Sequence, residues 1–162
     1  MKIYIGSDHT GYELKEKLKK YLNELELHYE LVDKGAFKYD ADDDYPDFIK
    51  PVAEAVANDK GSFGIILGGS GQGEAMCANK ISGVRAAVFY GEVVPQETVD
   101  IKGDKSTDPF EIILLERQHN NANILSLGVR FLSFDEIKFA AELFLKTEFS
   151  GEERHLRRIN KF

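Results

Sequence analysis

Short apolar runs alternate with amphipathic stretches along the chain. The spacing predicts buried strands at residues 2–7, 28–33, 63–67, 84–90 and 123–128. Between them, helices are predicted at residues 12–22, 46–58 and 110–121. Another helix is predicted to begin near Ser133, because Ser133 and Glu136 have the spacing of a capping box. Five strands that alternate with helices predict an α/β protein whose parallel sheet is covered by helices on both faces.

Parallel sheets of this kind bind their ligands at the carboxyl ends of the strands. In this sequence, that rule brings three polar segments to one edge: "SDHTG" after the first strand, "GGSGQGE" after the third, and the residues that follow "SLG". We therefore expect the chemistry of the protein to lie along this edge of the sheet.

The segment "GGSGQGE" opens a short helix and ends in a carboxylate, Glu74. A P-loop would need Lys followed by Ser or Thr after its last glycine, and a dinucleotide loop would need a different glycine spacing, so both nucleotide interpretations are disfavoured. Small residues let backbone N–H groups approach a ligand oxygen, which suits an oxyanion formed when a proton leaves a carbon beside a carbonyl. Glu74 would then be the base. The alternative is that Glu74 only complements the helix dipole.

Two further pairs of polar residues stand next to predicted strands. Asp8 and His9 directly follow the first strand, where a helix cap and a surface histidine are the alternative to a functional role. His119 and Asn120 stand in "RQHNNAN", just before the last strand, where an ordinary helix terminus is the alternative. Taken singly, neither pair separates chemistry from helix capping.

The C-terminal "ERHLRRINKF" is the one basic cluster of an acidic chain. At helical spacing, Arg154 and Arg158 share a face and His155 lies beside them. Two guanidinium groups on one face suit a phosphate, and Arg130, beyond the last strand, is a further cation. The alternative is a solvated basic tail.

Two stretches fit the alternating pattern less well. Residues 38–47 are strongly acidic, but Tyr45 stands where a calcium-binding EF-hand loop needs glycine, so we expect a solvated turn there. Residues 91–109 form a polar connection longer than the roughly 12 to 15 residues that need no explanation. This connection is a lid, an interface arm or an insertion.

Length and charge limit the classes of function. The chain has 162 residues, which predicts one domain, and its net charge of -7 argues against broad binding to nucleic acid or to anionic membranes. No apolar run approaches the roughly 20 residues of a membrane span. The single cysteine, Cys77, excludes an internal disulfide and suits a reducing compartment. We expect a cytoplasmic protein.

The polar segments together carry a resemblance that none carries alone. "SDHTGYELK", "DDYPD", "GGSGQGE" with "ANK", "GVRAAV", "RQHNNAN" followed by "LGVR", and "RHLRRI" stand in this order over nearly the whole chain. The sequence thereby resembles the ribose-5-phosphate isomerase B family, in its glutamate-base branch. The resemblance implies a single Rossmann-like α/β/α sandwich domain over residues 1–162. It also implies a homodimer or homotetramer with active sites between subunits, and a C-terminal helix, about 150–162, that packs on a partner.

The resemblance also implies a reaction, the interconversion of ribose 5-phosphate and ribulose 5-phosphate through an enediolate, without metal or cofactor. Glu74 matches the proton-transfer base, while Gly68 stands where another branch has a cysteine base, and His119 matches the residue that assists ring opening. Sugar-contacting or oxyanion-stabilising positions are matched by Asp8, Ser70, Gly69, Gly71, Gly73, Tyr45 and Asn120. Positions at the phosphate end are matched by His9, Arg130, Arg154, His155 and Arg158. The alternatives are a six-carbon substrate, such as allose 6-phosphate, and a phosphosugar-binding module without catalysis.

Overall fold

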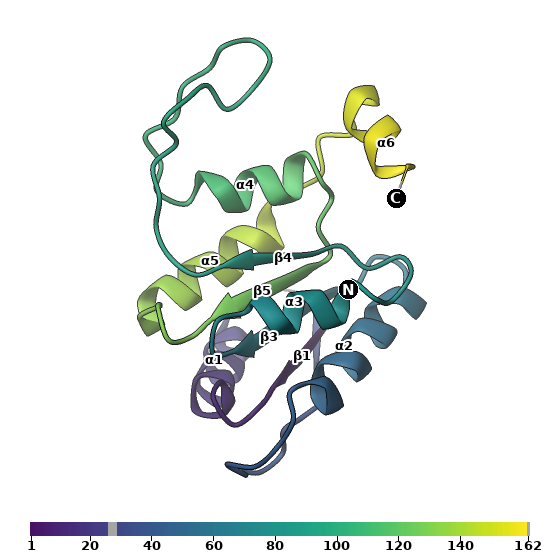
Figure 1. Cartoon of the computed structure of the whole chain (residues 1–162), viewed down its shortest axis with the longest axis vertical. Coiled ribbons are helices and arrows are strands. Elements are labelled where there is room, and N and C mark those ends of the chain that lie inside the picture. Colours follow the sequence, from purple (N-terminus) through teal and green to yellow (C-terminus); the bar gives the residue numbers. More distant parts are fainter. Residues whose placement is uncertain (26–28, 162) are drawn as a thin grey trace.

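The predicted parallel sheet is confirmed. In this computed structural model, which describes residues 1–25 and 29–161, five parallel strands form one sheet in the order β2-β1-β3-β5-β4 (Figure 1). The strands are β1 (Lys2–Ser7), β2 (Glu30–Asp33), β3 (Phe63–Gly68), β4 (Ala86–Phe89) and β5 (Ile124–Gly128). Along β1, Ile3 and Ile5 face one apolar cluster and Tyr4 faces another, as the alternation of side chains in a strand requires.

The helices form two layers because the sheet has an apolar cluster on each face. One cluster packs against α1 (Tyr12–Glu24), α4 (Glu111–Gln118) and α5 (Phe134–Lys146). The opposite cluster packs against α2 (Pro46–Asn58) and α3 (Gln72–Ala78). The predicted three-layer α/β/α arrangement is therefore confirmed. A last helix, α6 (Glu153–Ile159), is set apart from these layers (Figure 1). Of the helices in the described ranges, none is long and apolar enough to span a membrane.

Most predicted element boundaries differ from the structure by a few residues at most. The first residue of the predicted strand 28–33, His28, lies outside the described residues. The helix predicted to run to residue 121 ends at Gln118, and His119 is its C-cap. The capping box is confirmed: Glu136 N–H donates to Ser133 Oγ at 3.2 Å, and Ser133 N–H donates to Glu136 Oε2 at 2.7 Å.

The strand register brings the predicted edge together. Ser7 lies opposite Leu67 across the β1–β3 pair, and Gly68 lies opposite Gly128 across the β3–β5 pair. The three loops that follow these strands therefore leave the sheet side by side. The loop after β5 also bonds to the glycine loop, since Val129 N–H donates to Gly68 O at 3.0 Å.

The long connection between β4 and α4 has no helix or strand over residues 91–109. Its two ends are joined where Val93 N–H donates to Pro109 O at 2.9 Å. Nearer its tip, Asp100 Oδ1 accepts bonds from the N–H groups of Lys102 and Asp104, at 2.9 and 3.0 Å. Figure 1 shows this arm extending past α4 on the side of the molecule where α6 lies.

Candidate active site

A hollow of about 240 Å³ lies at the carboxyl edge of the sheet. It brings together predicted residues from the start of α2 and from the three loops that follow β1, β3 and β5. The strand register places these three loops side by side. Its lining residues are Asp8, His9, Thr10, Tyr45, Gly69, Ser70, Gly73, Glu74 and Arg130. The rule that parallel sheets bind ligands at the carboxyl ends of their strands therefore correctly located these members of the predicted site.

The glycine loop reaches this edge through a left-handed turn. Gly71, the N-cap of α3, has a φ of +74°, a backbone conformation that favours glycine. Its carbonyl accepts a bond of 2.7 Å from the buried Ser126 Oγ, which anchors the loop on β5. Gly71 does not line the hollow, so its visible role is to shape the loop, whereas Gly69 and Gly73 line the hollow directly.

Glu74 lines this hollow and is buried, with 5% of its surface exposed. Burial raises the pKa of its carboxyl group above the ordinary value, and the nearby Asp8 adds to the rise. Hydrogen bonds from the backbone N–H groups of Glu74 and Gly71, together with the charge of Arg130, oppose that rise in pKa. The helix terminus alone would have predicted a lowered pKa, so burial decides the direction. A carboxylate with a raised pKa is the stronger proton acceptor.

Asp8 and Ser70 both accept hydrogen bonds from backbone N–H groups of their own loops. Asp8 Oδ1 accepts from the N–H groups of Thr10 and Gly11, at 3.0 and 3.3 Å. Ser70 Oγ accepts from Gln72 N–H at 3.3 Å. The N-cap of α1 is Gly11, without a side-chain cap bond, so Asp8 does not cap the helix but holds the loop before it. Both side chains line the hollow.

His9 is held by a residue that our sequence analysis missed. Asp43 Oδ1 lies 2.6 Å from His9 Nδ1 and accepts the His9 backbone N–H at 3.0 Å. The Asp43 side chain is only 9% exposed, so the expectation that residues 38–47 are merely a solvated turn is wrong at this position. The carboxylate raises the pKa of His9 through this hydrogen bond. Asp8, His9 and Asp43 also group like metal ligands, but His9 and Asp43 bond to each other and Asp8 Oδ1 accepts bonds from the loop backbone.

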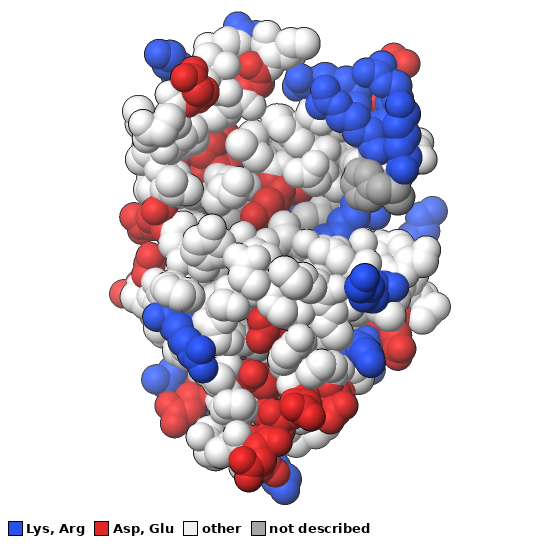
Figure 2. All heavy atoms as spheres, in the orientation of Figure 1, with Lys and Arg blue, Asp and Glu red and all other residues white. Residues whose placement is uncertain are grey.

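The remaining basic residues lie around a second hollow of about 310 Å³. His119, Arg154, His155 and Arg158 line it together with residues 98–101 of the arm. Figure 2 shows Lys and Arg side chains gathered over α6, whereas Asp and Glu gather at the opposite end of the molecule. Within one chain, the predicted site residues therefore divide between two hollows.

The imidazole rings of His119 and His155 stack, with centroids 4.1 Å apart and planes 15° apart. Burial lowers the pKa of both, and the charge of Arg154 lowers each pKa further, so the neutral forms are favoured at neutral pH. His155 is 3% exposed, and its Nε2 has no hydrogen-bond partner among the described residues. In this chain His155 supports the His119 ring, and its burial does not fit the expected direct contact with phosphate.

Asn120 lies apart from both hollows. It lines a third, beside Arg85 and Ile159, and its carbonyl accepts from Arg85 Nε at 3.1 Å. Its expected contact with substrate is therefore not visible within one chain.

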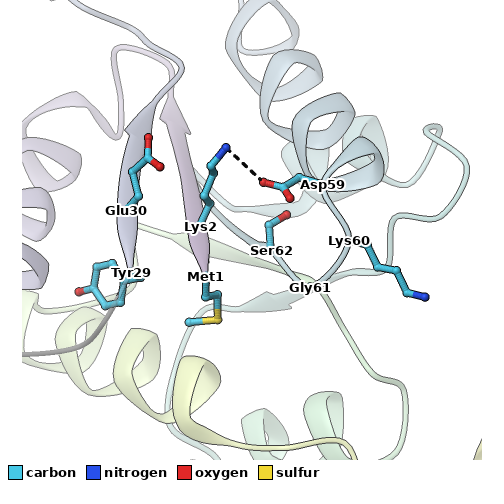
Figure 3. Close-up of a pocket in the computed structure, with 8 residues that line it drawn as sticks. All are labelled: Met1, Lys2, Tyr29, Glu30, Asp59, Lys60, Gly61 and Ser62. Carbon is cyan, nitrogen blue, oxygen red and sulfur yellow. Dashed lines mark ion pairs between the residues drawn. The ribbon is translucent and has the colours of Figure 1, made fainter.

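A wider hollow, of about 630 Å³, lies at the opposite edge of the sheet, near the amino ends of β1 and β2 (Figure 3). Its carboxylate Asp59 is already engaged by Lys2, at 3.7 Å, and by the Tyr4 hydroxyl, which donates at 2.8 Å. None of the predicted site residues lines it, so size alone does not identify the site.

Comparison with known proteins identifies the family of the chain. A family model described as Ribose/Galactose Isomerase matches residues 3–101 and 109–162. The chain belongs to this family. Within the Ribose/Galactose Isomerase family, it is 38% identical over 160 residues to ribose-5-phosphate isomerase B of Mycobacterium tuberculosis, covering 99% of this chain and 86% of that protein. It is 40% identical to a probable ribose-5-phosphate isomerase B of Mycoplasma genitalium, covering 98% and 91%.

Solved structures of the same kind have the same fold. The Mycoplasma genitalium enzyme, crystallised with bound ribulose-5-phosphate, superposes with a TM-score of 0.82 at 38% identity, covering 99% of this chain and 92% of that one. The type B ribose 5-phosphate isomerase of Trypanosoma cruzi superposes with a TM-score of 0.83 at 35% identity, covering 99% and 95%. Residues 102–108 of the arm stand outside the match to the Ribose/Galactose Isomerase family model.

Proposed function

We propose that the protein is an aldose–ketose isomerase that interconverts ribose 5-phosphate and ribulose 5-phosphate. The observation that carries this proposal is the buried carboxylate of Glu74 beside the glycine loop, in a chain whose family relatives are ribose-5-phosphate isomerases. A relative that binds ribulose-5-phosphate supports the choice of substrate.

Glu74 is the proposed base. It removes the proton from C2 of the open-chain aldose and returns a proton to C1. Between these two steps the aldehyde oxygen at C1 gains a proton and the hydroxyl oxygen at C2 loses one, so that C2 becomes the carbonyl carbon of the ketose. The backbone N–H groups of the glycine loop, with Gly69 and Gly73 in the lining, are the proposed donors to the enediolate oxygen. Ser70 and Asp8, which line the same hollow, are proposed to contact the sugar hydroxyls. We propose that neither metal nor cofactor takes part.

His119 is the proposed acid–base group for opening the furanose ring. Because it lies in a different hollow from Glu74, we propose that one complete site takes Glu74 from one subunit and His119 from another. The assembly would be a homodimer or a homotetramer, with α6 packed on the partner. His9 and Arg130 from one side, and Arg154 and Arg158 from the other, would then surround the phosphate.

A six-carbon sugar phosphate is the second candidate substrate. The observation in its favour is the arm: residues 102–108 interrupt the family match, and the adjoining residues 98–101 line the hollow that contains His119. A change at this wall alters the space next to the ring-opening residue. A binding module without catalysis would need the basic cluster but would leave the buried Glu74 without a role.

Proton exchange tests the proposal directly. The protein is incubated with ribose 5-phosphate in deuterated water, and NMR follows deuterium at C1 of ribulose 5-phosphate, with Glu74→Gln as the matched variant. Incorporation by the unaltered protein alone supports the reaction and the base. An active Glu74→Gln protein would contradict the role of Glu74. If no ketose forms, the same assay with allose 6-phosphate separates a shifted specificity from a binding module.

A further inference from the structure

The contact between Asp43 and His9 joins two loops that are far apart in the sequence. One carboxylate oxygen of Asp43 contacts two polar groups of His9: the backbone N–H donates to it at 3.0 Å, and Nδ1 lies 2.6 Å from it. The His9 side chain is 29% exposed and that of Asp43 is 9% exposed. The partly exposed ring is therefore fixed from behind by a nearly buried anion.

This pairing decides which ring nitrogen meets a ligand. An ionised carboxylate only accepts hydrogen bonds, so His9 Nδ1 carries the proton that bonds to Asp43. The other nitrogen, Nε2, remains for whatever occupies the hollow that His9 lines with Arg130 and Gly69. With both nitrogens protonated, the ring is a cation close to a guanidinium group, and such a pair suits a phosphate dianion.

We propose that Asp43 is a positioning residue for phosphate recognition, which holds His9 as a protonated donor beside Arg130. This inference rests on the proposed function for its phosphorylated substrate. Asp43 acts through His9 and touches neither the sugar nor the phosphate.

The charged groups around His9 have opposing effects on its pKa. Asp43 raises the pKa of His9 most, through the hydrogen bond, and the charges of Asp8 and Asp43 add to the rise, whereas partial desolvation and the charge of Arg130 lower that pKa. The ring of Tyr39 stands edge-on at 6.4 Å and brings no charge. Without the Asp43 carboxylate, Arg130 would favour the neutral imidazole. A neutral ring offers the phosphate one charge-assisted donor fewer.

The test compares Asp43→Asn with the unaltered protein and with Asp42→Asn, a neighbouring exposed acid. Asparagine keeps an acceptor for the His9 backbone N–H and removes the charge. NMR of the imidazole C–H signals, with His9→Gln for assignment, measures the pKa of His9, and titration with inorganic phosphate measures its dissociation constant. We expect Asp43→Asn to lower the pKa of His9 and to weaken phosphate binding about tenfold, as for loss of one charged hydrogen bond. We expect Asp42→Asn to change neither.

A double-mutant cycle separates positioning from a structural effect. In the His9→Gln background, Asp43→Asn should have no further effect on phosphate affinity. In the isomerase assay, Asp43→Asn should raise KM for ribose 5-phosphate about tenfold, with kcat within about twofold, and the KM defect should shrink as the pH is lowered. Unchanged phosphate affinity, or an equal loss in the His9→Gln background, would overturn the inference. Because phosphate binding is measured without turnover, this result stands apart from whether the protein isomerises ribose 5-phosphate.

Discussion

The carboxylate of Glu74 occupies the space that a side chain at Gly68 would need. A Cβ atom built on Gly68 would lie 1.8 Å from Glu74 Oε1 and 2.2 Å from its carboxyl carbon. A side chain at residue 68 and the observed position of the Glu74 carboxylate therefore exclude each other. Glycine is therefore required at residue 68 if the carboxylate of Glu74, on α3, is to occupy this position.

Gly68→Ala should consequently abolish activity without touching the substrate. The new methyl group must displace the Glu74 carboxylate, and a displacement of about 1 Å costs on the order of a hundredfold in turnover. We expect kcat in the ribose 5-phosphate assay to fall at least that far while circular dichroism still shows the folded protein.

Gly61→Ala provides the matched control for Gly68→Ala. Gly61 lies at the opposite edge of the sheet with a φ of +87°, and nothing lies within 4 Å of a Cβ placed there. The strained backbone should cost about 1 to 2 kcal/mol of unfolding free energy, measured with urea, and leave kcat unchanged. Full activity in Gly68→Ala, or an activity loss shared by Gly61→Ala, would contradict the steric argument.

The fold and the location of one half of the site were predictable because both follow from periodicity. Alternating apolar runs and helical spacing gave the five strands, and parallel strands place "SDHTG" and "GGSGQGE" at the same edge. The shorter α4 was not predictable in the same way. Its last apolar residue is Leu115, and the polar residues 116–121 carry no periodicity that fixes where the helix ends, which is at Gln118.

The rest of the site depends on contacts that no local pattern encodes. Asp43 stands among other acids, and only the fold distinguishes it by placing it against His9. The stacking of His155 on His119 joins α6 to the end of α4, two elements separated by the last strand and α5. A basic face on a C-terminal helix was visible in the sequence, but not which of its members is buried.

Glu116 should destabilise the protein as the pH rises. It is 6% exposed, its Oε2 has no hydrogen-bond partner in the described part of the chain, and burial raises its pKa to about 8. The folded state therefore holds a proton that the unfolded chain releases near its ordinary pKa of about 4.3, so stability falls as the pH rises from there to about 8. Glu116→Gln should be more stable than the unaltered protein at pH 8 by up to about 5 kcal/mol.

Urea unfolding at pH 5 and at pH 8 checks this prediction. The gain from Glu116→Gln should be larger at pH 8 than at pH 5. Glu148→Gln, which changes an exposed acid, should show no such dependence. An equal stability difference at both pH values would mean that Glu116 is ionised, or protonated, across the whole range.

The stacked pair His119 and His155 should make the protein less stable in mild acid. The pKa of each is lowered in the folded state, so the unfolded chain takes up protons first, near its ordinary pKa of about 6.5. Stability should therefore fall as the pH drops through that value. His155→Phe keeps a ring in the stack and removes one titrating group, so its loss of stability between pH 7.5 and pH 5.5 should be smaller. His119→Phe should behave in the same way. If both variants lost as much stability as the unaltered protein over this pH range, the two histidines would not be the cause of the loss.

Mixed dimers test whether one site draws on two subunits. Glu74→Gln and His119→Ala should each be nearly inactive alone. If Glu74 comes from one subunit and His119 from the other, a dimer of the two variants has one site with both natural residues and one with neither. Equal amounts that associate at random would give about a quarter of the natural activity. Different affinity tags on the two variants verify that mixed dimers form. If each site lay within one subunit, every site would carry one defect and the purified mixed dimers would stay inactive.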